Sequence, residues 1–271
     1  MKDLGCSTIL YGGFSLEQAL EGIAKAGYKA IEICARPGMA PHLEIGRTAS
    51  YYEEIKAQVA SHGLVIESIA GTGGIGLDSP EFDTVIEAAQ QVGAPALAEG
   101  AGGKSDDEAS FKQIVELINA TAARTSQAGI KLSLKPHVNN AVYSTETALR
   151  LMREVDREWV GINFDASHIW RTAAAENPVK SLQQLKDYIA TLRIRDNRES
   201  REGPIGPVET QIPGKGSIDL PALAAVMNAI DHVAYVTLEI VGTHGGTDTP
   251  LAEVQRVVDE SIAYLEPLFV T

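Results

Sequence analysis

The sequence predicts an α/β protein built as a single (β/α)8 TIM-type barrel. Short apolar runs alternate with longer amphipathic segments, glycine follows several of these segments, and the pattern repeats roughly every 30 residues, the length of a βαβ unit. The chain has 271 residues, and a barrel of this kind typically takes about 250. No Pro/Ser-rich linker or block of charge marks a second domain, so residues 1–271 are expected to form one barrel.

The apolar runs are the predicted barrel strands. Each is short and often β-branched, as expected for parallel strands buried on both faces. The predicted strands are Cys6–Tyr11, Ala30–Cys34, Val65–Ala70, Ala94–Glu99, Lys131–His137, Val160–Asp165, Leu192–Asp196 and Tyr235–Val241.

The segments between the strands are predicted helices with recognisable ends. Ser15 is a typical N-cap, and Gly27 follows the last residue of the same helix. Ser79 is expected to cap a helix whose first residue is Pro80. The predicted helices are Ser15–Ala26, Tyr51–His62, Pro80–Val92, Asp106–Ala128, Thr145–Val155, Pro178–Tyr188, Leu220–Ile230 and Pro250–Leu265.

The amino-acid composition limits the kinds of molecule that the protein is expected to bind. The net charge is −13 and the pI is near 4.9, so an acidic surface is expected to repel nucleic acid and anionic membranes. Cys6 and Cys34 are too few for a disulfide framework, which favours a reduced, cytoplasmic protein. The N-terminus lacks the apolar region of a signal peptide, and no apolar run has the length of a membrane span. The sequence leaves open whether the chain forms a homo-oligomer.

Polar residues at the C-terminal ends of barrel strands point towards the active site. Lys135 and His137 lie two apart on one strand and therefore face the same way, with Pro136 between them. We expect both to reach the site. The alternative is that Lys135 extends to solvent along an apolar stem and that His137 is structural.

Two further strand ends carry isolated charges. Asp165, with His168 just beyond it, is expected to hold a cation or a substrate hydroxyl, although Asp165 could instead cap the following turn. Glu239 ends an otherwise apolar strand, where a lone glutamate is costly unless it is paired or used. It is therefore a candidate acid or base, or the partner of an ion pair that only holds the barrel together.

The remaining candidates have weaker support. Glu32 lies on the second strand, and His42 and His244 lie in loops after strands, from which they could contact a substrate. The irregular stretch Asn197–Ser217 is long for a compact domain, which favours a loop that closes over the substrate.

Several segments resemble the xylose isomerase-like TIM barrel superfamily, which includes sugar phosphate isomerases and epimerases, inosose dehydratases and AP endonuclease family 2. They are Lys135–Asn139, Asp165–His168, Arg193–Asp196, Gly214–Asp219 and Leu238–Glu239. The resemblance implies one divalent metal held by a Glu on strand five, an Asp on strand six, a His on strand seven and a Glu on strand eight, with the two glutamates moving a proton next to a carbonyl group.

The chain departs from this implied metal site at two positions. Asp165 and Glu239 match ligands, but the strand-five position is Lys135 and the strand-seven position is Arg193. At an effective dielectric near 20, unit charges about 4 Å apart interact by about 4 kcal/mol, so two fixed cations would repel a divalent ion. We therefore expect no metal cofactor, with Lys135 and Arg193 neutralising Asp165 and Glu239.

A divalent Mn, Mg, Zn or Co ion remains the alternative, with Asp165 and Glu239 as ligands and His137 and His168 completing the site.

Together these features predict an enzyme that acts on a small carbohydrate-type molecule. The first expectation is a sugar or keto-sugar-acid isomerase or epimerase that transfers a proton next to a carbonyl, with Glu239, His137 and Lys135 as catalytic residues. The alternatives are a decarboxylase or dehydratase on a keto-sugar acid, and an inactive sugar-binding barrel. The expected substrate-binding residues are Asp165, His168, Arg193, Arg195, Glu32 and His42.

Overall fold

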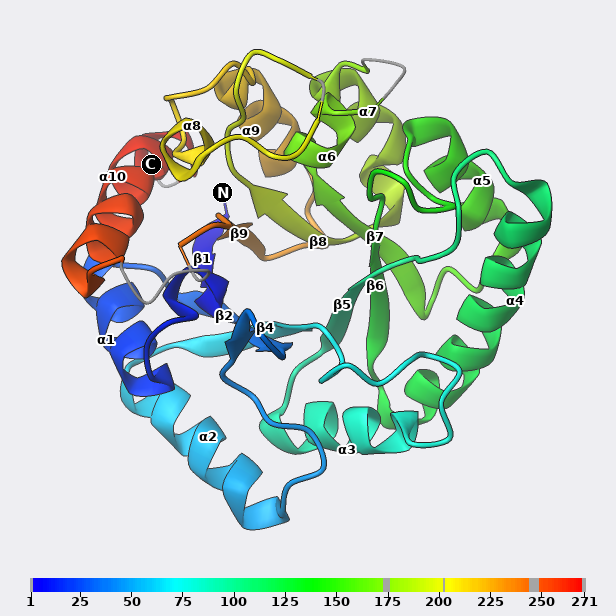
Figure 1. Ribbon diagram of the computed structural model, residues 1–271, viewed down its shortest axis with the longest axis horizontal. Coiled ribbons are helices and arrows are strands. Elements are labelled where there is room, and N and C mark those ends of the chain that lie inside the picture. The colour runs from blue at the N-terminus through cyan, green and yellow to red at the C-terminus, as the bar shows by residue number, and fades with distance from the viewer. Residues whose placement is uncertain (1, 173–175, 202, 244–248, 270–271) are drawn as a thin grey trace.

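Eight parallel strands and the helices around them form a closed barrel in the part of the chain that the structure describes (Figure 1). The structure is a computed structural model, and it describes residues 2–172, 176–201, 203–243 and 249–269. Strand β1 (Asp3–Ser7) closes the ring, because it pairs with β2 (Ala30–Arg36) on one side and with β9 (Tyr235–Leu238) on the other. The predicted (β/α)8 barrel is confirmed.

The other strands follow the ring in chain order, with one short addition. Strand β3 (Ala40–Pro41), which was not predicted, pairs antiparallel with the end of β2. The remaining strands are β4 (Val65–Ala70), β5 (Ala96–Gly100), β6 (Lys131–Lys135), β7 (Val160–Asp165) and β8 (Ile189–Ile194).

The helices begin and end largely where the capping residues predict. Ser15 forms a capping box with Gln18, and Gly27 ends the same helix with a φ of 107°. The main helices are α1 (Leu16–Ala26), α2 (Ala49–Ser61), α3 (Phe82–Val92), α4 (Glu108–Thr125), α5 (Thr145–Glu154), α7 (Pro178–Leu185), α9 (Leu220–Asn228) and α10 (Leu251–Phe269). The short helices α6 (Ala166–Trp170) and α8 (Val208–Gln211) lie between a strand and its main helix.

Some predicted boundaries are wrong for local reasons. The first strand ends at Ser7 rather than Tyr11, because Ser7 Oγ accepts from the Ile9 amide and the chain turns into a 3-10 helix. Strand β6 ends at Lys135, where Pro136 can donate no further hydrogen bond. Helix α3 starts at Phe82 rather than Pro80, since Ser79 Oγ binds the Glu81 amide outside the helix.

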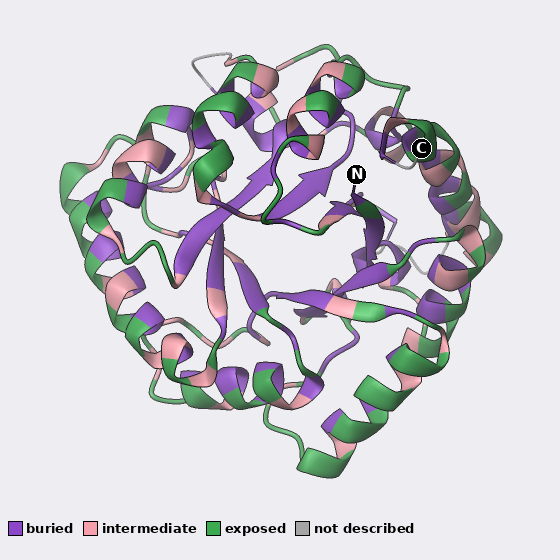
Figure 2. Ribbon diagram, turned by 180° about the vertical axis from the view of Figure 1, so that it is seen from behind, coloured by how far each residue is buried: buried purple, intermediate pink, exposed green. Residues whose placement is uncertain are grey.

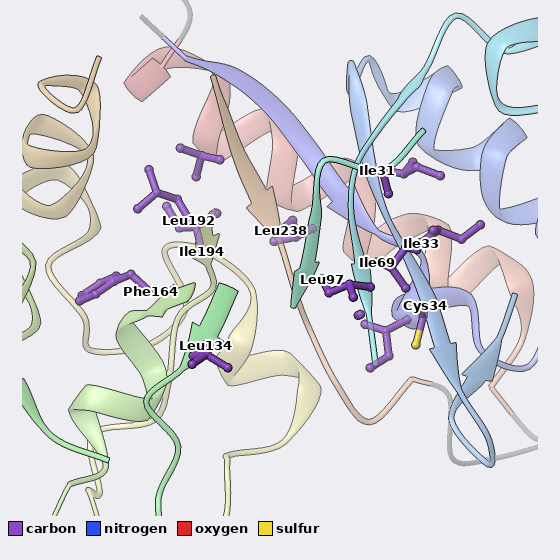
Figure 3. Packing of buried hydrophobic residues seen from close by; sticks show 14 of the residues in the cluster. Ile31, Ile33, Cys34, Ile69, Leu97, Leu134, Phe164, Leu192, Ile194 and Leu238 are labelled. Atoms are coloured by element: carbon purple, nitrogen blue, oxygen red, sulfur yellow. The ribbon is translucent and has the colours of Figure 1, made fainter. Parts of the chain in front are cut away.

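The strands separate apolar from charged side chains. On β8, Leu192 and Ile194 alternate with Arg193, and successive strand residues point to opposite faces. The apolar series from neighbouring strands packs as one cluster (Figure 3), and the strands are almost entirely buried (Figure 2). The charged series therefore fills the interior of the barrel and reaches its C-terminal end.

Two further findings concern the cysteines and membrane-spanning helices. Cys6 and Cys34 are both free and buried. Among the described residues, no helix combines the length and the apolar character that a membrane crossing requires.

Candidate active site at the C-terminal end of the barrel

A cavity of about 940 Å³ opens at the C-terminal ends of the strands. This volume lies within the usual range for a small-molecule site. The cavity lining includes six of the predicted site residues: Glu32, Lys135, His137, His168, Arg195 and Glu239. Of the other predicted residues, Asp165 and Arg193 lie directly beneath the lining and His42 lies apart from it.

Lys135 lies between two carboxylates at the floor of the cavity. Its Nζ is 2.6 and 2.7 Å from the two carboxylate oxygens of Glu239 and 3.4 Å from Asp165 Oδ2. Burial alone would raise the pKa of Glu239, but the nearby Lys135 and Arg195 outweigh it and hold that pKa below its usual value. Glu239 is therefore an ionised partner of the ammonium at neutral pH.

Asp165 is held by a second cation from the next strand. Arg195 Nη2 lies 2.7 Å from Asp165 Oδ2, and Arg195 Nε donates to Ser167 Oγ at 2.8 Å. Ser167 in turn donates to Asp165 Oδ1 from both its amide and its hydroxyl. Although burial opposes it, Arg195 and Lys135 keep the pKa of Asp165 well below its usual value. Lys135, Asp165, Arg195 and Glu239 are called the cavity cluster below.

Arg193 forms a separate cluster deeper in the barrel. It makes an ion pair with Glu32 Oε2 and lies 2.9 Å from Glu67 Oε1. Arg193 also approaches Glu239 to 3.6 Å, as the sequence led us to expect, whereas Asp165 is paired with Arg195 at 2.7 Å rather than with Arg193. Burial raises the pKa of Glu67, with Arg193 opposing it only in part. Arg193, Glu32 and Glu67 are called the inner cluster below.

Two histidines lie together at the cavity wall, with ring centroids 4.2 Å apart. His137 Nδ1 is 2.8 Å from the Val138 carbonyl, so that nitrogen donates and the neutral ring carries its lone pair on Nε2. Burial lowers the pKa of His137. Burial also lowers the pKa of His168 well below its usual value, and Arg195 and Lys135 add to this effect. Both rings are therefore neutral at pH 7.

The two loop histidines among the candidates are not in the described cavity lining. His42 is buried, and its Nε2 contacts the Phe14 carbonyl at 3.0 Å rather than the cavity. His244 lies outside the described residues.

Several cavity-lining residues were not predicted from the sequence, among them Arg36, Asn163 and Arg171. Arg36 pairs with Glu99 at 3.1 Å, Asn163 lies on β7, and Arg171 follows α6. Asn163 could have been found from its position two residues before Asp165, which places both on the same face of the strand. Arg36 is the last residue of β2, but the predicted strand ended at Cys34, and Arg171 follows the short helix α6, so neither lay at a predicted strand end.

The described part of the segment after β8 forms one wall of the cavity through residues 204–208. Buried Asp196 anchors it by accepting from the amides of Asn197, Gly214, Gly216 and Ile218. A Cβ at Gly216 would collide with the Asp196 carboxylate, so this close approach requires glycine at position 216. Closure of the segment over a substrate stays a prediction.

The donor set does not fit a divalent metal. The ammonium of Lys135 stands between Asp165 and Glu239, where a cation would have to bind both carboxylates. Throughout the described ranges, no group of three or more His, Cys, Asp or Glu residues is placed to hold a metal ion. The alternative donor set of Asp165, Glu239, His137 and His168 therefore does not assemble in this structure.

Comparisons with known proteins agree with the fold and name two kinds of enzyme. The family model "Xylose isomerase-like TIM barrel" matches residues 20–268. An inosose dehydratase of Clostridium perfringens is 22% identical over 144 residues, covering 49% of this chain and 48% of the relative. A 3-dehydroshikimate dehydratase of Bacillus anthracis is 29% identical over 121 residues, covering 41% of this chain and 42% of the relative. The matched segments thus span about half or less of each curated relative.

Solved structures share the fold at low sequence identity. A D-psicose 3-epimerase, solved in the presence of D-fructose, superposes with a TM-score of 0.75 at 13% identity and covers 100% of both chains. The IOLI protein, solved with a zinc atom, superposes with a TM-score of 0.73 at 18% identity and also covers 100% of both chains. At these identities the likeness concerns the fold alone, and a metal is compatible with the fold but not required by it.

Proposed function

The chain belongs to the xylose isomerase-like TIM barrel family, and on that premise we propose that it is a metal-independent lyase that breaks a bond next to the carbonyl group of a keto-sugar acid. One observation carries the proposal: the Lys135 ammonium is fixed by Glu239 and Asp165 at the floor of the cavity. Lyase reactions of this type push electrons into a carbonyl and form an enolate. A fixed cation at the developing oxyanion lowers the barrier.

The same observation favours a lyase over an epimerase. The resemblance implies two glutamates that move a proton on and off the substrate, and here one of the two positions is Lys135. The remaining Glu239 accepts hydrogen bonds from Lys135 on both oxygens, and its lowered pKa makes it a weak base. A lyase needs only one proton-transfer group, which His137 supplies.

The tautomer of His137 supports dehydration in particular. Its unprotonated Nε2 would take the proton next to the carbonyl, and the electron pair of that C–H bond would form the enolate beside Lys135. The enolate would then expel the β-hydroxyl, and the imidazolium would return the same proton to it as water leaves. Neutral His168 and the Asp165–Arg195 pair would hold other polar groups of the substrate.

An isomerase or epimerase remains the second candidate, because Glu239 and His137 both line the cavity from different strands. Such an enzyme would use them as two proton-transfer groups. The inactive sugar-binding barrel is the third interpretation.

Product analysis distinguishes these reactions. We would incubate the purified protein with a panel of keto-sugar acids in D₂O, with and without EDTA, and follow the products by NMR. The expected result is loss of water from at least one acid, unchanged by EDTA. Release of CO₂ would keep the lyase class but remove the base role of His137. An isomeric product, or turnover that EDTA abolishes, would contradict the proposal.

A further inference from the structure

Arg171 is the cavity cation without an acidic partner among the described residues. The other lining cations are paired: Arg36 with Glu99, Lys135 with Glu239 and Arg195 with Asp165. Within the described ranges, the guanidinium of Arg171 contacts only neutral groups, at 3.1–3.3 Å: the Ser167 and Gly203 carbonyls and His168 Nδ1. A half-buried guanidinium with no counter-ion is costly, which favours an anion from outside the chain.

A second unpartnered donor lies on the far side of the same histidine. Arg195 is 2% exposed and lines the cavity, yet its Nη1 has no hydrogen-bond partner in the described ranges. Arg195 Nη2 contacts His168 Nε2 at 3.2 Å, while Arg171 Nη2 contacts His168 Nδ1. The two guanidinium groups therefore flank one neutral imidazole ring, and both keep donors for another acceptor.

Arg171 stands outside both clusters. The cations Lys135, Arg193 and Arg195 are each paired within the clusters with Glu239, Glu32 or Asp165. Arg171 has no ion pair with any of these carboxylates among the described residues, so its charge is the one in the cavity that a bound anion can match.

We infer that Arg171 and the free Nη1 of Arg195 form a subsite for one carboxylate group of the substrate. This inference rests on the proposed function and narrows its substrate class to monoanionic sugar acids. A phosphate group, with its charge near −2, would exceed the single unmatched cation. A guanidinium presents several donors in a planar fork that suits a carboxylate. Arg171 thus acts as a specificity-determining residue.

Binding measurements test the subsite without requiring turnover. We would titrate D-threonate, D-xylonate and D-gluconate into the protein by calorimetry, each beside the uncharged alditol of the same carbon skeleton and beside inorganic phosphate. At least one sugar acid is expected to bind at least tenfold more tightly than its alditol and than phosphate. Arg171→Gln should remove about tenfold to hundredfold of that affinity, the size of a hydrogen bond to a charged group.

Matched variants separate recognition from folding. Arg171→Lys should keep part of the preference for the acid, and Arg124→Gln should change it by less than about threefold, since Arg124 pairs with Asp83 outside the cavity lining. Unchanged alditol affinity in Arg171→Gln would show that the cavity is intact. Equal binding of every acid and its alditol, tighter binding of phosphate, or equal losses for acid and alditol in Arg171→Gln would overturn the inference. A preference for the acid without lyase turnover would overturn only the proposed function.

Discussion

The inner cluster and the cavity cluster are built from the same residue types on the same ring of strands, but they differ in access. The Arg193 side chain is 0% exposed, whereas the Lys135 side chain is 13% exposed and lines the cavity. The Arg193 guanidinium is enclosed by Glu32, Glu67 and Ser68, while Lys135 lies where it can add a hydrogen bond to a substrate. Access to the cavity, and not charge alone, therefore separates Lys135 from Arg193 as a candidate for contact with a substrate.

The largest expected effect is on stability, and it compares the inner cluster with an exposed network of ion pairs. Arg193→Met should lower the free energy of unfolding by about 3–5 kcal/mol, because it leaves Glu32 without its buried counter-ion. Arg256→Met, in an exposed network with Glu253 and Glu260, should leave it nearly unchanged. Chemical denaturation measures both, and similar losses in the two variants would remove the distinction.

The next effect belongs to the cavity cluster and should appear in activity. Lys135→Met should reduce kcat by about 10²–10³, equivalent to about 2.7–4 kcal/mol, the usual result of removing one oxyanion donor. Lys131→Met, at the opposite end of the same strand, is the matched control and should keep full activity. Steady-state kinetics on the substrate found by NMR gives the comparison. Full activity in Lys135→Met would show that this ammonium only balances charge.

A smaller effect concerns the dependence of stability on pH. His168 and His42 have pKa values that burial lowers in the folded chain, so the unfolded chain binds more protons below about pH 6.5. Their contribution to stability is present above that pH and is lost as the pH falls, by up to about 1.4 kcal/mol per pH unit for each histidine. Denaturation between pH 7 and 5 should show this slope. His168→Asn should flatten it, and an unchanged slope would mean that His168 is charged in the folded protein.

The smallest effect lies inside the inner cluster. Glu67 accepts hydrogen bonds on Oε1 from Ser68 and Thr237, and its raised pKa favours the neutral form. Glu67→Gln keeps an acceptor and cannot ionise, so the free energy of unfolding should change by less than about 1 kcal/mol. Because the pKa of Glu67 is raised in the folded chain, the protein should become less stable as the pH rises through that pKa. The Glu67→Gln variant should not show this decrease. A large loss of stability would show that Glu67 is ionised.

Much of the architecture was predictable because it depends on local patterns. The apolar runs gave the bounds of β4 and β7 without error, and Ser15 and Gly27 marked both ends of α1. Errors arose where side chains compete for backbone groups, as Ser7 does at the end of β1. The sequence identified candidate residues that lie at the ends of predicted strands. It did not identify Arg171, which follows the short helix α6, because no apolar periodicity predicts this helix.

The sequence alone determines which side chains share a face of a strand, since alternation places Asn163 with Asp165 on β7 and sets Arg193 apart from Leu192 and Ile194 on β8. Only the tertiary structure decides their partners: Arg193 meets Glu32 and Glu67, while Arg195, two residues later, meets Asp165. The physical reason is that ion pairing depends on distance across the closed ring. That distance follows from the stagger of the strands, which local sequence patterns do not encode.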